Sequence, residues 1–106
     1  MDENSTYSWI FLSTAFASES EPANYESISH IADGINHAVP THKELQTSLA
    51  WLTKTELVEK SGKNYQLTNK GTEMINKAKS RTNNVILNIW DELSKEIEKT
   101  KAQQML

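Results

Sequence analysis

The apolar residues of this 106-residue chain recur mostly at the spacing of an α-helix. In the segments 24–36, 41–55, 69–79 and 82–104 they fall about three or four positions apart, so each segment has one apolar face. Residues 1–18 differ, because apolar side chains lie nearly all round the helix that they would form. We therefore predict five helices, of which the first is well buried or shared with a partner.

Residues that cap helices support these boundaries. Thr41 and Glu44 form a capping box, in which each side chain accepts a hydrogen bond from the other residue's backbone amide. Three further helix starts have residues that can accept from first-turn amides: Asn24, Thr68, and Asn4 or Ser5. The polar interval 80–84 has weak helix propensity, which predicts a break before the last helix.

A β-hairpin is predicted directly after the segment 41–55. Residues 57–60 and 65–67 are β-prone, and the four residues between them include three turn formers. Val39 could add one strand residue beside this hairpin. Gly34, inside a helix, costs about 1 kcal/mol relative to alanine, and close packing against the following helix would explain it.

The outer face of the segment 41–55 is small, polar and cationic. At about 100° per residue, five side chains lie away from its leucines: Lys43, Gln46, Thr47, Ala50 and Lys54. Such a face suits a DNA major groove, because lysine binds phosphate or guanine, glutamine can bind adenine, and a small residue permits close approach. An ordinary solvated helix face has the same pattern, so this stripe alone leaves both interpretations open.

The stretch 25–79 resembles the winged helix-turn-helix family, with the MarR- and PadR-like regulators as the nearest examples. The similar residues are Glu44-Leu45, Leu49 and Leu52, Leu57-Val58, and the run Tyr65-Gln66-Leu67-Thr68-Asn69-Lys70-Gly71. This run matches the family's tyrosine-x-leucine-threonine-x-x-glycine pattern position by position. One residue departs from the family: Glu56 stands where a glycine usually adopts a left-handed conformation, which costs another residue about 1 kcal/mol.

The resemblance implies a fold and a mode of DNA binding. The fold is mainly α with a small β-hairpin wing, in one domain over residues 1–106: an N-terminal helix (1–18), a winged-helix core (24–79) and a C-terminal helix (82–104). The segment 41–55 is then the recognition helix in the major groove, and the wing, 57–67, places Lys60 and Lys63 on backbone phosphates. We expect sequence-specific binding of double-stranded DNA by a small transcriptional regulator. The alternative is a winged helix that contacts another protein and does not bind DNA.

The terminal helices have more apolar surface than a three-helix core requires. Seven of their residues could form a homodimer interface: Trp9, Phe11, Ile86, Ile89, Trp90, Leu93 and Ile97. Two-fold DNA sites require two-fold proteins, and the regulators that the chain resembles dimerise through flanking helices, so we expect a homodimer. The open alternative is that the terminal helices pack on each other within one chain.

Charge is unevenly distributed along the chain. The net charge of −3 by itself disfavours a polyanion as partner. Residues 1–42 contain six acidic residues and no lysine or arginine, whereas residues 43–81 contain eight basic and four acidic residues. Net positive charge is therefore confined to the expected recognition helix, the wing and the helix after it, and its modest size predicts weak DNA binding by a single copy.

No pattern indicates an enzyme, a cofactor or a metal site. The histidines at positions 30, 37 and 42 lack the spacing of a zinc clip, and phosphate-binding glycine loops and nucleophile elbows are missing. With no cysteine, disulfides and thiolate zinc ligation are excluded. The acidic first eight residues do not suit a secretory signal, and no apolar run reaches the roughly 18 residues of a membrane span. We expect a cytoplasmic protein that is not an enzyme and does not enter a membrane.

Overall fold

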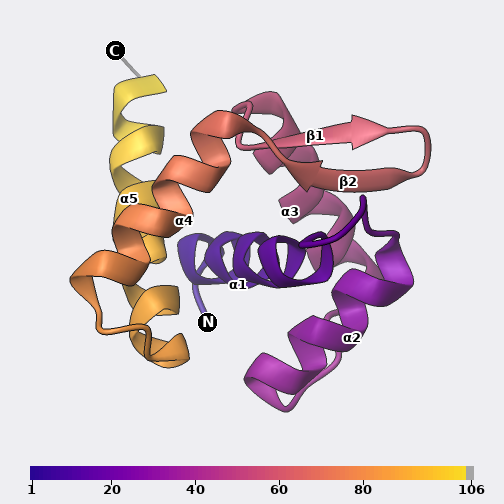
Figure 1. Ribbon diagram of the computed structural model, residues 1–106, viewed down its shortest axis with the longest axis horizontal. Helices are drawn as coiled ribbons and strands as arrows, with labels where there is room; N and C mark the ends of the chain where they lie inside the picture. Colours follow the sequence, from indigo (N-terminus) through magenta and orange to yellow (C-terminus); the bar gives the residue numbers. More distant parts are fainter. Residues whose placement is uncertain (105–106) are drawn as a thin grey trace.

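The helix α1, Glu3–Ala17, lies at the centre of the molecule and contacts every other helix (Figure 1). Tyr7 to Thr14 are all buried, as the apolar side chains on every side of this segment predict. Its N-cap differs from the predicted Asn4 or Ser5. Asp2 caps the helix by accepting from the Ser5 amide, and this hydrogen bond lowers the pKa of the Asp2 carboxyl.

The helices α2, Tyr25–Asn36, and α3, His42–Lys54, begin where the sequence predicts. Asn24 caps α2 by accepting from the Ser27 amide. The predicted capping box of α3 is present, and it fixes the first turn of the helix whose outer face is the candidate site.

The hairpin consists of β1, Val58–Ser61, and β2, Asn64–Leu67, paired antiparallel with Lys60 opposite Tyr65. Each strand extends one residue further toward the turn than predicted. The turn therefore contains only two residues, of which Gly62 has a φ of 62°, as tight hairpin turns require.

A third extended segment joins the hairpin, but it is not the predicted Val39. Ala23 pairs with Tyr65, and each backbone amide donates to the other residue's carbonyl at 2.8 Å. Val39 is instead exposed in the connection between α2 and α3. The Ala23 pairing fixes the start of α2 against β2.

The helices α4, Asn69–Arg81, and α5, Ile86–Gln104, are separate, which confirms the predicted break. Asn83 and Asn84 between them have φ values of 57° and 63°, a left-handed conformation that asparagine tolerates and an α-helix does not contain. The reversal at these residues lays α5 beside α4 and α1 (Figure 1).

The packing of α5 on α1 corrects the predicted dimer surface. Five of its seven residues lie in the core of the single chain: Trp9, Phe11, Ile89, Leu93 and Ile97. Trp90 is half-buried, and its Nε1 donates to the Ser5 carbonyl at 2.8 Å. Ile86 alone of the seven is exposed. The chain itself thus covers most of the apolar surface of its terminal helices.

Three residues shape the junction of α3, the hairpin and α4. Glu56 has a φ of 64°, so a glutamate adopts the left-handed turn. Gly71 lies so close to Leu57 that a Cβ would be 2.0 Å from the Leu57 carbonyl oxygen. Thr68 caps α4 while its hydroxyl donates to the Glu56 carbonyl.

Around Gly34, by contrast, a Cβ would meet nothing within 4 Å, so its predicted close packing is wrong.

The computed structural model describes residues 1–104, which form a mainly helical fold with one two-stranded antiparallel sheet. Within these residues, no helix combines the length and the apolar character needed to cross a membrane.

Candidate nucleic-acid interface

The outer face of α3 is open to solvent. All five side chains predicted for it are exposed: Lys43, Gln46, Thr47, Ala50 and Lys54. The opposite face is buried through Leu45, Leu49 and Leu52, and α3 contacts α1 and β1. The amphipathic pattern thus separates buried from exposed residues correctly, and residues 1–104 leave the stripe exposed.

The lysines of this stripe are available to a ligand. Neither Lys43 nor Lys54 forms an ion pair among residues 1–104. Glu44, the acidic residue next to Lys43, instead accepts from the Thr41 amide at 2.8 Å in the capping box. The outer face of α3 therefore has uncompensated positive charge.

The hairpin adds two more lysines, at the positions predicted to contact phosphate. Lys60 lies in β1 and Lys63 in the turn, and neither has an ion-pair partner in the described part of the chain. Glu59 alternates with Lys60 along β1, so its side chain lies on the other face, where it accepts from Gln66 at 2.7 Å.

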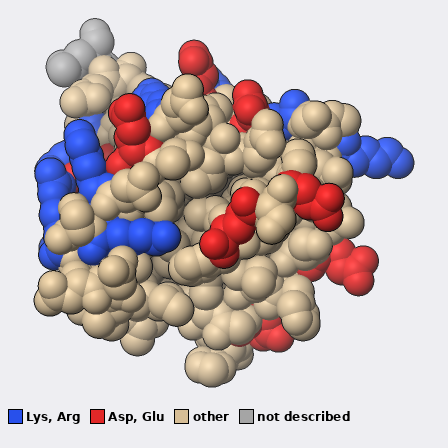
Figure 2. All heavy atoms as spheres, viewed as in Figure 1, with Lys and Arg blue, Asp and Glu red and all other residues tan. Residues whose placement is uncertain are grey.

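The basic residues of α4 contribute less to this surface than the sequence predicts. Arg81 pairs with Glu92 and Glu96 of α5, at 3.3 and 3.2 Å. The Lys79 amine lies 5.7 Å from the centroid of the Phe16 ring. Figure 2 shows basic side chains in separate groups, at the hairpin tip and over α4 and α5. The candidate interface therefore narrows to α3 and the hairpin.

One flank of α3 is held by the start of α1 and the end of α5. Trp51 stacks on Tyr7, with ring centroids 4.8 Å apart. The Lys101 amine lies 4.7 Å from the Tyr7 centroid and pairs with Glu3. Burial, together with the Glu3 carboxylate, raises the pKa of Tyr7. Periodicity gives no signal for this cluster, because Glu3 and Lys101 are 98 positions apart.

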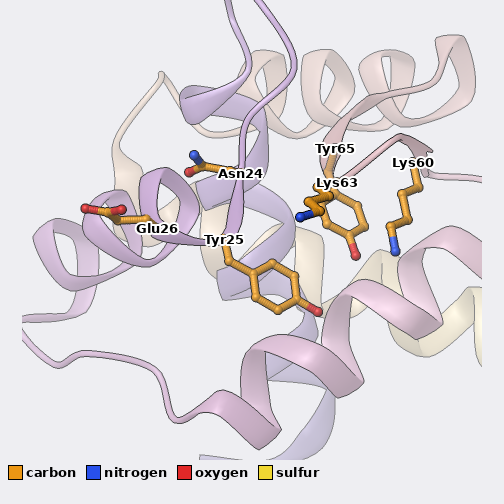
Figure 3. A pocket seen from close by; sticks show the side chains of 6 residues that line it. All are labelled: Asn24, Tyr25, Glu26, Lys60, Lys63 and Tyr65. Atoms are coloured by element: carbon orange, nitrogen blue, oxygen red, sulfur yellow. The ribbon is translucent and has the colours of Figure 1, made fainter.

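A cleft of about 410 Å³ lies between the start of α2 and the hairpin (Figure 3). Six residues line it: Asn24, Tyr25, Glu26, Lys60, Lys63 and Tyr65. The rings of Tyr25 and Tyr65 stack with centroids 5.8 Å apart, and the Lys60 amine lies 5.7 Å from the Tyr65 centroid. Sequence patterns did not predict a role for Tyr25, whose only local signal is its place beside the Asn24 cap.

Within residues 1–104, no group of three or more histidine, aspartate or glutamate side chains is placed to hold a metal ion. Comparisons of the chain with protein-family models, with curated proteins and with solved structures find no match.

Proposed function

We propose that the protein binds double-stranded DNA as a winged helix-turn-helix transcriptional regulator. The observation that supports this most directly is the exposed, cationic face of α3 next to a hairpin whose two lysines form no ion pair within residues 1–104. The order α2, α3, β1, β2, with Ala23 as a third strand residue beside β2, also supports the winged-helix assignment. A cytoplasmic location is part of the proposal, because a chain without cysteine does not need an oxidising compartment.

In the proposed complex, α3 lies in the major groove. Gln46 can bind adenine, and Lys43 and Lys54 can bind guanine or phosphate. The small side chains of Thr47 and Ala50 permit close approach to the bases. The hairpin acts as the wing, and its lysines neutralise backbone phosphates, which adds affinity without reading sequence.

Fluorescence anisotropy with labelled duplex DNA tests this proposal. If each protomer neutralises about three to four phosphates, log K for a dimer falls against log salt with a slope near −6. The double variant Lys43→Gln/Lys54→Gln should weaken binding strongly. Lys77→Gln, which removes one exposed charge from α4, is the control, and it should weaken binding by much less than half as much in log K. Failure of the wild-type protein to bind duplex DNA at low salt would exclude the function.

We further propose that the regulator is a homodimer whose copies meet at an apolar groove between α2 and the start of α5. The groove is lined mainly by Phe16, Ile31, Ile35, Ile86 and Leu87, and its lining contains no lysine, arginine, aspartate or glutamate. Val85, Ile86 and Leu87 are 51%, 43% and 62% exposed, and contiguous exposed apolar side chains mark interaction sites. His30 and His37 also line the groove. A two-fold interface places a surface against its own copy, so a lining without lysine, arginine, aspartate or glutamate limits self-repulsion.

The same groove favours a second candidate function, contact with a different protein without DNA binding. The net charge of −3 is compatible with this function. Gln46→Arg distinguishes the two candidates, because it adds a cation to the exposed face of α3 and leaves the small side chains of Thr47 and Ala50 in place. Duplex affinity should rise if α3 binds DNA, and it should stay undetectable if the protein only contacts another protein.

A further inference from the structure

We infer that the cleft between α2 and the hairpin binds one phosphate group, held by Lys60, Lys63 and the Tyr25 hydroxyl. The inference rests on the proposed function, since we assign this phosphate to the DNA backbone. It adds one defined phosphate site, to which α2 contributes the Tyr25 hydroxyl. The proposed function alone requires only a general attraction between the lysines of the hairpin and DNA.

Backbone pairing and ring stacking form the cleft before any ligand binds. The two hydrogen bonds between Ala23 and Tyr65 place Tyr25, two residues along the chain, beside β2. The rings of Tyr25 and Tyr65 are nearly parallel, with an interplanar angle of 16°. Tyr25 also meets the edge of the His42 ring, at 6.0 Å between centroids. The cleft is thus tied to α2, β2 and the start of α3, and binding there orders few groups.

The charges around the cleft favour an anion. Lys60 lies opposite Tyr65 in the strand register, so both side chains lie on the same face of the hairpin. Figure 3 shows the amines of Lys60 and Lys63 on either side of the Tyr65 ring. Glu26 also lines the cleft, but its carboxylate points away from the tyrosines and the lysines (Figure 3). Two positive charges are therefore left without a nearby counter-charge.

The donors suit a phosphate in particular. Lysine binds phosphate as a point charge, and three donors from different elements can reach several oxygens of a tetrahedral group. Burial is the main cause that raises the pKa of Tyr25, so its hydroxyl keeps its proton and can donate to a phosphate oxygen. A DNA backbone and free phosphate supply the same group, but the contact with His42 places the cleft next to the DNA-facing helix.

Two measurements on the full chain test the inference. In anisotropy titrations with duplex DNA, Lys60→Gln/Lys63→Gln should make the salt slope shallower by about one unit per chain, whereas Lys77→Gln should have a smaller effect. Tyr25→Phe should weaken binding about three- to tenfold with an unchanged slope, because no charge is lost. In NMR titrations of the ¹⁵N-labelled protein, inorganic phosphate should shift the amides of Tyr25, Lys63 and Tyr65, and Lys60→Gln/Lys63→Gln should abolish these shifts.

The possible results separate this inference from the proposed function. If the α3 double variant abolishes duplex binding while Lys60→Gln/Lys63→Gln keeps the wild-type slope, the cleft inference is overturned and the proposed function stands. If duplex DNA does not bind but inorganic phosphate gives the lysine-dependent shifts, the phosphate site stands with free phosphate as its source, and the proposed function fails. If neither titration responds to the cleft variants, the phosphate site is excluded.

Discussion

At the scale of residues, two helical glycines have opposite surroundings. A Cβ at Gly71 would overlap the Leu57 carbonyl oxygen, whereas one at Gly34 would meet nothing within 4 Å. Gly71→Ala should lower the free energy of unfolding by about 2 kcal/mol or more, because the helix must move away from the backbone of Leu57. Gly34→Ala should raise it by roughly 0.5–1 kcal/mol, since alanine is the better helix former. Urea unfolding followed by circular dichroism measures both, and equal effects would contradict the close contact at Leu57.

Glu56 offers a second residue-scale test, of backbone strain. Its φ of 64° costs a residue with a Cβ about 1 kcal/mol relative to glycine. Glu56→Gly should therefore raise the free energy of unfolding by about 1 kcal/mol. Glu56→Ala removes the same charge but keeps the Cβ, so it should give no comparable gain. An equal gain in both variants would assign the effect to the charge.

Residue-level prediction succeeded where helical periodicity decides exposure. The outward side chains of α3, from Lys43 to Lys54, are exposed as their spacing predicts. It failed for Tyr25, because the role of this residue depends on the pairing of Ala23 with Tyr65 across the fold. The spacing of apolar residues describes one helix at a time, so it does not predict which backbone segments pair across the fold.

At the scale of elements, local signals gave the correct starts of three helices. Asn24, Thr41 and Thr68 cap the helices that they were expected to cap, because a cap bonds to amides only a few residues away. The terminal helices show the limit of such reasoning. An apolar face indicates that a surface must be buried, but it does not say whether the same chain or a second copy covers it. In this structure α1 and α5 cover each other.

The start of α3 provides a test at the element scale. The Thr41 hydroxyl accepts from the Glu44 amide at 3.0 Å, and Thr41→Ala leaves this amide without its partner. The free energy of unfolding should fall by about 1 kcal/mol. Thr47→Ala, the same change at an exposed position inside α3, should have little effect or stabilise the helix slightly. If both variants lost stability equally, the capping box would not account for the effect.

At the scale of the whole molecule, the arrangement of charge matters more than its total. Counting charges along the sequence predicted a positive middle region. It could not show that Arg81 pairs with Glu92 and Glu96 of α5, or that the remaining lysines lie in separate groups (Figure 2). With a net charge of −3, the proposed approach to DNA depends on the local cationic surface of α3 and the hairpin. We expect one copy of that surface to bind weakly, so the proposed regulator depends on association of two chains.

The proposed dimer gives a molecular-scale prediction. Leu87→Glu places one carboxylate from each copy in a groove whose lining contains no lysine or arginine, where the two charges would repel each other and lose hydration. Sedimentation equilibrium should show a two-chain mass for the wild type and a one-chain mass for Leu87→Glu, and the salt slope on duplex DNA should fall from near −6 to near −3. Gln103→Glu, the same added charge at an exposed position near the end of α5, should leave both values unchanged. A one-chain mass for the wild type, or a two-chain mass for Leu87→Glu, would exclude this groove as the dimer interface.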